Sequence, residues 1–469
     1  MDKISLRSTS DGWRGKIADS FTFDFVGRVA TAISSYILRH GGTETFVGYD
    51  TRFLSFEFAK QAGQVLSQFG LNVFISSKPI PTPMVSFRTN QKAMICGITI
   101  TASHNPYDYN GIKVRMGYGG APSEEFTLDI QNLMNSRTNR VICENSDLKK
   151  DDPFNGYCQK LRTIIDWEVF NGRPLKIAVD TMHGTTKGIL KGVLRGSKAE
   201  VLEIHTDFDP YFGGIAPEPM ESNTQKLQGV ISGGKCDLGI AHDGDGDRIM
   251  AVIPEIGYLS PNDVTVVLLW YLAKMRKQTG IVIGSVTMSK RLSYLANYLG
   301  FVYRETPIGF RNACEIMRNE KVLIAGEENG GIGFGFYLPE RDATLAAILL
   351  SEAEIIYKGG ISGILKEVEK IAGKSGFSRL NLKSLISPAV VMKKLKREVP
   401  EKLAGQVVSK IREVDGLKLF FESGDWVNIR AAGTEELLRI YAESSNKEKA
   451  LAIAEATKEI IKKIDGGER

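Results

Sequence analysis

The chain alternates segments with helical and strand-like spacing of apolar residues, and this alternation limits how it can fold more than any other feature. Near the start, residues 25–38 and 56–69 have helical spacing, whereas residues 71–75 and 93–100 resemble short strands. Helix and strand patterns that alternate in this way predict α/β layers built on parallel sheets. The polar residues 135–153 predict a boundary after this first unit.

Similar units follow along the chain. The second contains strand-like residues 175–179 and 201–204, and the third contains a helical stretch at 264–276 and a strand at 281–286. Residues 374–387 look like a linker, after which short helix and strand patterns are mixed. The predicted architecture is therefore three α/β domains followed by a smaller α+β domain. The expected domain ranges are 1–150, 151–257, 258–373 and 374–469.

A loop of small and polar residues follows the strand predicted at 93–100. It reads T-A-S-H-N-P, and N-G-I-K follows a few residues later. The C-terminal ends of strands are where α/β sheets hold their ligands. Ser103 in this loop could act as a nucleophile or carry a phosphoryl group, with Lys113 a short way on. The structural alternative is a plain Asx-type turn.

A second loop contains three aspartates that alternate with glycine, Asp243, Asp245 and Asp247, between two apolar strands. The glycines allow a tight turn, so all three carboxylates can face one point. A hard divalent cation would offset their mutual repulsion. An EF-hand fits poorly, because Arg248 and Pro254 replace its glycine and glutamate. Arg248 beside a metal would suit a phosphate site, whereas a solvated acidic turn is the structural alternative.

Two further loops also follow predicted strands. In G-E-E-N-G-G, Glu327 and Asn329 could contact sugar hydroxyls, although a glycine-rich hairpin explains the sequence equally well. In R-A-A-G-T-E, a phosphate could be held by Arg430, by the backbone N–H groups around Gly433 and by the Thr434 hydroxyl.

Composition excludes several classes of function. A net charge of +5 on 469 residues gives no polybasic field for nucleic acid, although it would suit an anionic small substrate. The five cysteines have no paired spacing, which favours free thiols in a reducing compartment. The N-terminus has no apolar signal segment, and the longest apolar run, 264–273, is too short to span a bilayer. We therefore expect a cytoplasmic protein without membrane partners.

Together these motifs resemble those of the α-D-phosphohexomutase superfamily, the phosphoglucomutases and phosphomannomutases. The resemblance covers essentially the whole chain, in the family's order. It implies a heart-shaped arrangement of four domains, three α/β and one α+β. The main motifs lie at 11–15 (D-G-W-R-G), 101–106 with 110–113, 243–248, 326–331 and 430–435, and secondary matches lie at 179–184, 212–219 and 306–310.

The resemblance also implies a reaction. Hexose 1-phosphate and hexose 6-phosphate, of glucose and/or mannose, would interconvert through a phosphoserine enzyme and a hexose 1,6-bisphosphate, which also serves as activator. Positioning and charge neutralisation supply most of the catalysis in such phosphoryl transfer. The implied catalytic residues are Ser103, Lys113, Arg14 and Arg248; the implied Mg²⁺ ligands are Ser103, Asp243, Asp245 and Asp247; the implied substrate-binding residues are Glu327, Asn329, Arg430, Gly433, Thr434 and His104.

The chain departs from the family pattern in the two loops that read the substrate. Asn329 stands where serine is usual, and Gly331 where some members have histidine. Ala432 replaces a serine, and Glu436 replaces a proline. The choice between glucose, mannose and glucosamine therefore stays open, as do the alternatives of a phosphoglucosamine mutase and a glucose-1,6-bisphosphate synthase. The sequence does not indicate an oligomeric state.

Other classes explain fewer of the motifs. An aspartyl-phosphate phosphatase would also place a D-x-D loop after a strand, but Gly246 stands where it usually has Thr or Val. A serine hydrolase would need a G-x-S-x-G elbow, which the neighbours of Ser103 do not provide. An inactive sugar-phosphate-binding homologue is the main non-enzyme alternative. The presence of Ser103, Lys113 and all three aspartates argues against it.

Overall fold

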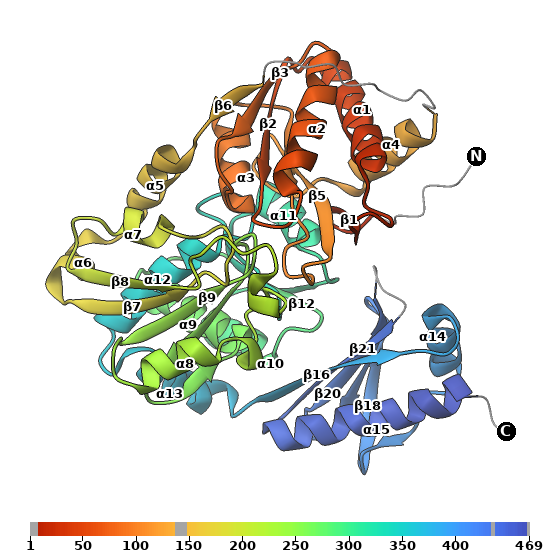
Figure 1. Ribbon diagram of the computed structural model, residues 1–469. Helices are drawn as coiled ribbons and strands as arrows, with labels where there is room; N and C mark the ends of the chain where they lie inside the picture. Colours follow the sequence, from red (N-terminus) through yellow and green to blue (C-terminus); the bar gives the residue numbers. More distant parts are fainter. Residues whose placement is uncertain (1–7, 137–147, 433–436, 467–469) are drawn as a thin grey trace. The chain divides into compact units, whose positions relative to one another are not determined.

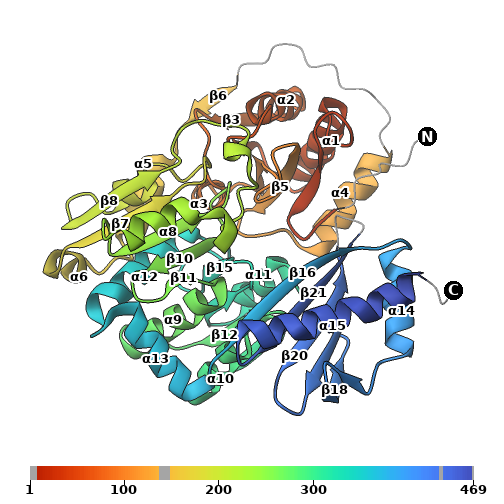
Figure 2. The same cartoon turned by 60° about the horizontal axis from the view of Figure 1, so that its bottom comes forward.

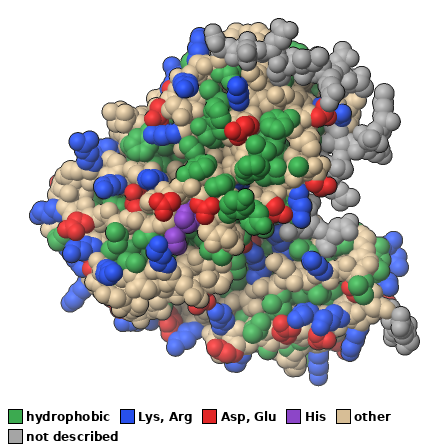
Figure 3. Space-filling view, in the orientation of Figure 1, with side chains coloured by type: hydrophobic (Ala, Val, Ile, Leu, Met, Phe, Trp, Pro, Cys, Tyr) green, Lys and Arg blue, Asp and Glu red, His purple; other side chains and the backbone are tan. Residues whose placement is uncertain are grey.

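The computed structural model describes residues 8–136, 148–432 and 437–466, which fall into two compact units. The larger contains residues 1–281 and 309–365, and the smaller contains residues 282–308 and 366–469. Among the described residues, no helix is both long and apolar enough to cross a membrane. On the visible face in Figure 3, Lys and Arg side chains are interspersed with Asp and Glu, so this face carries no continuous basic field.

The first α/β layer is a six-stranded sheet with helices on both faces (Figure 1). Helices α1, α2 and α4 cover one face and α3 the other. In sheet order the strands are β1 (Gly12–Lys16), β5 (Tyr109–Met116), β4 (Cys96–Ile100), β2 (Glu44–Tyr49), β3 (Asn72–Ser76) and β6 (Lys149–Asp151). The helices are α1 (Phe23–Arg39), α2 (Ser55–Gln68), α3 (Thr82–Gln91) and α4 (Glu124–Ser136).

The predicted parallel pairing is correct only for part of this sheet. Strands β2, β3, β4 and β6 are parallel, whereas β5 runs antiparallel to both β4 and β1. The connection from β4 to β5, residues 101–108, is too short for the crossover that a parallel neighbour would need. The serine loop is therefore a hairpin connection, which brings Lys113 on β5 back beside β4.

Local sequence explains why α1 forms where the pattern at 25–38 predicts a helix. The Thr22 side chain accepts a hydrogen bond from the Phe25 N–H at 3.2 Å and so caps the first turn. Apolar residues at helical spacing, including Val26, Val29 and Ile33, are fully buried in the core.

The second layer is a five-stranded sheet. Its strand order is β11 (Gly257–Leu259), β10 (Ile249–Ile253), β9 (Leu238–His242), β7 (Leu175–Asp180) and β8 (Ala199–Ile204). Strands β9 and β10 form an antiparallel hairpin, and every residue of both is buried. The aspartate loop therefore has a rigid base on each side. The helices here are α5 (Phe154–Arg162), α6 (Trp167–Gly172), α7 (Ile189–Val193) and α8 (Gln225–Ser232), with short 3₁₀ turns η1 (Phe212–Gly214) and η2 (Glu221–Asn223).

The third module contributes elements to both units. The larger unit holds α9 (Pro261–Lys274), α11 (Phe310–Asn319), β14 (Val322–Gly326), β15 (Ile332–Phe334) and α12 (Ala343–Ile356). Strands β12 (Ile281–Ser285) and β13 (Tyr303–Thr306) pair in parallel, and α10 (Lys290–Tyr298) joins them. Helix α13 (Gly360–Ala372) leads into the C-terminal elements.

The C-terminal part is an antiparallel sheet covered by helix α15, as Figure 2 shows. The expectation that residues 374–387 are a linker is wrong, because residues 376–383 form a strand that pairs with β21. This strand lies at the sheet edge and is mostly half-exposed, so its sequence is polar. The elements are β16 (Gly376–Lys383), β21 (Leu437–Ser444), β20 (Trp426–Ala431), β19 (Leu417–Phe421), β18 (Gln406–Arg412) and β17 (Lys402–Leu403), with helices α14 (Pro388–Arg397) and α15 (Lys447–Gly466).

Candidate active site

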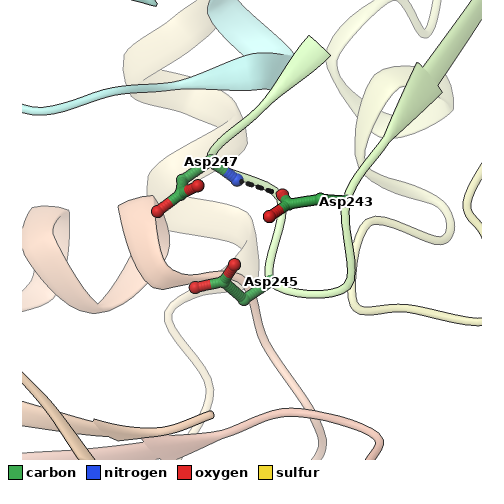
Figure 4. Close-up of side chains that lie close together, drawn as sticks. All are labelled: Asp243, Asp245 and Asp247. Carbon is green, nitrogen blue, oxygen red and sulfur yellow. Dashed lines mark hydrogen bonds between the residues drawn. The ribbon is translucent and has the colours of Figure 1, made fainter. Parts of the chain in front are cut away.

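Asp243, Asp245 and Asp247 lie in the turn between β9 and β10, and their carboxylates converge on one point (Figure 4). One oxygen of each lies within 4.8 Å of the others, and all three side chains are fully buried. The backbone N–H groups of Asp247 and Arg248 donate to Asp243 Oδ1 at 3.0 and 3.1 Å, which fixes the turn. The predicted convergence of the three carboxylates is confirmed.

Two glycines in this turn are required by close packing. Gly246 has φ +68°, and a Cβ atom there would lie 2.6 Å from a methyl carbon of Thr186. A Cβ atom on Gly244 would lie 2.8 Å from the Ser103 carbonyl oxygen. The aspartate loop and the serine loop therefore approach each other more closely than side chains at these two positions would allow.

Charge is unevenly balanced among the three carboxylates. Burial, together with the nearby charges of Asp245 and Asp247, raises the pKa of Asp243 well above its usual value. Burial also acts to raise the pKa of Asp245, but the charge and hydrogen bond of Lys113, together with hydrogen bonds from Thr82 and Ser103, lower that pKa overall. Lys113 Nζ lies 2.6 Å from Oδ2 of both Asp245 and Asp247. Arg341 Nη2 also lies 2.8 Å from Asp247 Oδ2, so the charge of Asp245 and Asp247 is offset by two close cationic groups, neither of which pairs with Asp243.

The donor set fits a hard divalent cation. Within the described residues, the buried Oδ1 atoms of Asp245 and Asp247 have no hydrogen-bond partner. Ser103 Oγ donates to Asp243 Oδ2 at 2.7 Å, so a fourth oxygen ligand lies beside the three carboxylates. Buried carboxylate oxygens without hydrogen bonds are stabilised by a metal ion, and oxygen-only sites suit Mg²⁺ or Ca²⁺.

Ser103 sits in an unusual backbone conformation. Its φ is +55°, and a non-glycine residue in such a conformation costs on the order of 1–3 kcal/mol. Its side chain is fully buried, and its N–H donates to Thr101 Oγ1 at 2.9 Å. His104 Nδ1 lies 3.5 Å from Ser103 Oγ. The surrounding structure therefore holds the serine hydroxyl at the carboxylate cluster against a local strain.

Arg52, which the sequence analysis did not identify, stabilises this strained loop by donating hydrogen bonds to its backbone. Its guanidinium donates to four loop carbonyl oxygens and pairs with Asp50 at 3.1 Å, and both of these charged side chains are fully buried. The ring of Phe212 stacks against it at 4.8 Å. The four acceptors are the carbonyl oxygens of Ser103 (2.6 Å), Asn105 (2.6 Å), Pro106 (2.7 Å) and Tyr109 (3.1 Å).

The other two predicted basic residues also lie near the carboxylates. Arg248 Nε is 3.9 Å from both Asp243 Oδ2 and Asp247 Oδ1. Arg14 lies on β1, opposite Gly111, and its Nη1 donates to Asn105 Oδ1 at 3.2 Å. Burial lowers the Arg14 pKa, and the nearby charge of Arg248 lowers it further. Two guanidinium groups from distant motifs thus share one region, as an anion-binding site requires.

The predicted sugar loop lies directly beside the aspartate loop. Arg248 and Gly331 form an isolated β-bridge, and the Ile249 N–H donates to the Gly330 carbonyl oxygen at 3.0 Å. Glu327 is buried and accepts from the Gly309 N–H at 2.9 Å. Asn329 Oδ1 accepts from the Gly331 N–H at 2.9 Å, so the amide that replaces the usual serine also stabilises the loop itself.

Arg341 connects the two loops and was also missed by the sequence analysis. Its Nη2 lies 2.8 Å from Asp247 Oδ2 and 2.8 Å from Asp11 Oδ2, and its Nη1 lies 3.3 Å from Glu327 Oε2. A Cβ atom on Gly331 would lie 2.4 Å from Arg341 Cδ. The arginine therefore occupies the space that a histidine side chain at position 331 would need.

Thr82, at the start of α3, is a third residue that the sequence analysis missed. Its hydroxyl donates to Asp245 Oδ2, and its N–H donates to the Asp245 carbonyl oxygen at 2.9 Å. The P-T-P sequence around it is a helix-start signal and could have indicated a helix N-terminus. Nothing local in the sequence indicates that this N-terminus faces a carboxylate. Arg52 and Arg341 likewise look like ordinary surface charges until the fold buries them.

The predicted phosphate loop belongs to the smaller unit. Arg430 lies near the end of β20, and its Nε is 3.3 Å from Asp415 Oδ1. The Ala432 N–H donates to the Leu437 carbonyl oxygen at 2.9 Å. Gly433 and Thr434 lie outside the described residues, as does Glu436, so their roles stay predictions.

Comparisons with known proteins cover nearly the whole chain. Four models of the phosphoglucomutase/phosphomannomutase family match: α/β/α domain I at residues 7–141, domain II at 155–257, domain III at 260–370 and the C-terminal domain at 392–460. A Methanosphaera stadtmanae protein named a probable phosphoglucosamine mutase is 30% identical, over 99% of this chain and 100% of its own length.

Two solved structures extend the comparison. The crystal structure of a "putative phosphomannomutase" from Thermus thermophilus is 30% identical, with a TM-score of 0.87 over 97% of this chain and 99% of that one. The Aspergillus fumigatus N-acetylphosphoglucosamine mutase, solved with GlcNAc-6P and magnesium, is 14% identical with a TM-score of 0.62, over 98% and 96% of the two chains. This second likeness concerns the fold alone.

Proposed function

Because this chain belongs to the phosphoglucomutase/phosphomannomutase family, we propose that it interconverts the 1- and 6-phosphates of glucose and/or mannose. It has the four domains of that family and is an enzyme, an intramolecular phosphotransferase of the phosphohexomutase group. We place the domain boundaries near residues 150, 257 and 373, and the protein in the cytoplasm.

The observation that carries the proposal is the contact between the Ser103 hydroxyl and the aspartate cluster, 2.7 Å from Oγ to Asp243 Oδ2. In the proposed cycle, a sugar hydroxyl attacks the phosphorus of phosphorylated Ser103, the bond from phosphorus to Ser103 Oγ breaks, and a hexose 1,6-bisphosphate forms. The bisphosphate then reorients in the site. Ser103 Oγ attacks the phosphorus of its other phosphate, the bond from that phosphorus to the sugar oxygen breaks, and Ser103 regains a phosphoryl group. Added bisphosphate would act as activator by rephosphorylating Ser103.

The residues around Ser103 take the roles that charge and position suit. Arg14 and Arg248 neutralise the charge of the transferring phosphoryl group. Lys113, held between two carboxylates, is the candidate to give and take the proton of the sugar hydroxyl. Ser103 and the three aspartates would hold Mg²⁺, which when bound withdraws charge from the phosphoryl oxygens. A protein of the same fold, the Aspergillus mutase, was solved with magnesium.

The remaining predicted residues bind the substrate. Glu327, Asn329 and His104 would contact sugar hydroxyls. The non-reacting phosphate would be held by Arg430, Gly433 and Thr434. A phosphosugar substrate is consistent with the phosphosugar bound in the Aspergillus structure. Glucosamine phosphate is the second candidate substrate, because a relative that is 30% identical is named a probable phosphoglucosamine mutase.

A coupled assay of isomerisation tests the proposal. Glucose, mannose and glucosamine 1-phosphates are each supplied with Mg²⁺, with and without the matching 1,6-bisphosphate. We expect turnover of glucose or mannose phosphate that rises when bisphosphate is added. Turnover of glucosamine phosphate alone would move the assignment to the second candidate. Release of inorganic phosphate without any isomerisation would contradict a mutase and favour a phosphatase.

A further inference from the structure

Asp415 occupies a strained turn between β18 and β19, in the smaller unit. Its φ is +48°, and the next residue, Gly416, has φ +120°. A Cβ atom on Gly416 would lie 2.3 Å from the Ile429 carbonyl oxygen and 2.9 Å from Asn428 Oδ1. The turn is therefore pressed against β20, one residue before Arg430. This packing fixes the direction of the Asp415 carboxylate independently of its own contacts.

The two oxygens of this carboxylate contact two segments that are far apart in the sequence. Oδ1 lies 3.3 Å from Arg430 Nε. Oδ2 accepts a hydrogen bond of 2.9 Å from the Ile308 N–H, in the T-P-I-G-F motif. The Asp415 side chain is 23% exposed and that of Arg430 is 14% exposed, so both remain within reach of solvent.

We propose that Asp415 is a positioning residue for the non-reacting phosphate: it holds Arg430 through Nε and fixes the segment at Ile308 with its other oxygen. The inference rests on the proposed function, in which Arg430 binds that phosphate. A guanidinium binds a phosphate most strongly through two parallel N–H groups. Contact at Nε leaves the two Nη nitrogens outside this ion pair, where they can form such a fork.

Asp415 would strengthen phosphate binding by orienting the Arg430 side chain before the phosphate binds. A long arginine side chain loses rotamer freedom when it binds a ligand, and a side chain that is already oriented loses less. Asp415 also carries negative charge, so it does not itself attract the phosphate. Its removal should therefore harm phosphate binding only through the orientation of Arg430, while the contact with the Ile308 N–H holds the carboxylate in place.

Neighbouring packing keeps the fold independent of this carboxylate. Leu417 and Ile429, opposite each other on β19 and β20, are buried in the core of the smaller unit. Glu413 offers a matched control in the same turn, because it pairs with Lys396 at 2.8 Å on the exposed surface. Replacing Glu413 removes a carboxylate of the same turn without touching Arg430.

The test measures KM and kcat for the hexose phosphate in Asp415→Ala, Asp415→Asn, Glu413→Ala, Arg430→Ala and the double variant Asp415→Ala/Arg430→Ala. We expect Asp415→Ala to raise KM about tenfold with a smaller change in kcat, and Asp415→Asn to fall between it and the wild type. An amide keeps one acceptor oxygen, so it rescues part of the effect. Glu413→Ala should match the wild type. In the Arg430→Ala background, Asp415→Ala should change KM less than twofold.

Other outcomes overturn the inference in distinguishable ways. If the wild type turns over and Asp415→Ala has the same KM, or a lower one, Asp415 does not position the phosphate site. If the two single effects multiply in the double variant, Asp415 acts independently of Arg430 and the inference also fails. If the wild type neither turns over nor binds glucose 6-phosphate or mannose 6-phosphate in calorimetry, the proposed function fails and the inference falls with it. Equal thermal midpoints of unfolding exclude a change of fold as the cause.

Discussion

Ser103 Oγ and Asp243 Oδ2 lie 2.7 Å apart although 140 residues of chain separate them. Both side chains are fully buried. Asp243 is also the carboxylate whose pKa burial and the like charges of Asp245 and Asp247 raise well above its usual value. The serine hydroxyl therefore donates to a carboxylate whose charged form is disfavoured by burial and by its like-charged neighbours.

Purified enzyme should carry one phosphoryl group on Ser103, and Ser103→Ala should abolish mutase turnover. No other hydroxyl is predicted to store the phosphoryl group between half-reactions. Intact mass and peptide mapping locate the phosphate, and the coupled assay measures turnover. Thr163→Ala, which alters an exposed hydroxyl, serves as the control and should behave as wild type. Stable phosphate on Asp243 would contradict the mutase and support a phosphatase.

Asp245→Asn should lower turnover by two or more orders of magnitude while the fold stays intact. The change keeps the side-chain shape but removes one of the three charges that attract a cation. Titration of activity with Mg²⁺ should show a higher half-saturating concentration. Asp129→Asn, on the exposed face of α4, is the matched control. Unchanged turnover of the Asp245 variant at low Mg²⁺ would rule out this metal site.

Arg52→Lys should lower kcat at least a hundredfold and lower the thermal midpoint of unfolding. A lysine keeps the charge but cannot donate to four carbonyl oxygens of the serine loop at once. The strained φ of Ser103 would then relax, and the hydroxyl would leave Asp243. The phosphoserine content, measured by mass, should fall along with kcat. Arg28 on α1 is half-exposed, so Arg28→Lys should leave kcat, the thermal midpoint and the phosphoserine content unchanged.

Restoring the usual hydroxyl with Ala432→Ser should lower KM for the hexose phosphate by about tenfold or more. A hydrogen bond to a charged group contributes roughly 1.5–3 kcal/mol, and about 1.4 kcal/mol corresponds to a factor of ten. A water that already fills the gap would reduce the effect. Arg430→Ala should raise KM, whereas Arg397→Ala on the exposed face of α14 should not. If neither Ala432→Ser nor Arg430→Ala changes KM for the hexose phosphate, the non-reacting phosphate is held elsewhere.

Asp342→Asn should flatten the pH dependence of stability below neutrality. Burial raises the pKa of Asp342 to about 6, so the folded state binds its proton more tightly than the unfolded state does. This group therefore makes the free energy of unfolding fall as pH rises from about 4 to about 6. The asparagine, which can still cap α12 at the Leu345 N–H, removes that fall.

Urea unfolding at several pH values measures this effect. Relative to the wild type, the Asp342 variant should gain about 2 kcal/mol between pH 4 and pH 7, since each pKa unit corresponds to about 1.4 kcal/mol and part of the change lies below pH 4. Other buried carboxylates contribute equally to both proteins and cancel in the difference. Asp129→Asn should give a curve parallel to that of the wild type. A parallel curve for the Asp342 variant would show that this carboxyl does not bind its proton more tightly when folded.

The sequence by itself determined those elements whose signals are local, and the chemistry that each loop can supply. Helical spacing at 25–38 was sufficient to place α1, because its cap and its apolar stripe are both local. The alternation of aspartate and glycine at 243–247 likewise required a tight turn with converging carboxylates, since the glycines and the flanking apolar strands are adjacent in the chain.

Only the tertiary structure decided which distant groups meet. Apart from Asp50 and Glu340, which lie close in the chain to Arg52 and Arg341, the partners of Arg52, Thr82 and Arg341 come from other elements. The local sequence therefore does not indicate these contacts. The strand at 376–383 was missed for a related reason: its half-exposed polar residues are ordered by hydrogen bonds from β21, not by an apolar pattern of their own. Apolar spacing and capping residues reflect interactions between residues that are close in the chain. Buried ion pairs and edge strands depend instead on contacts that exist only after the chain has folded.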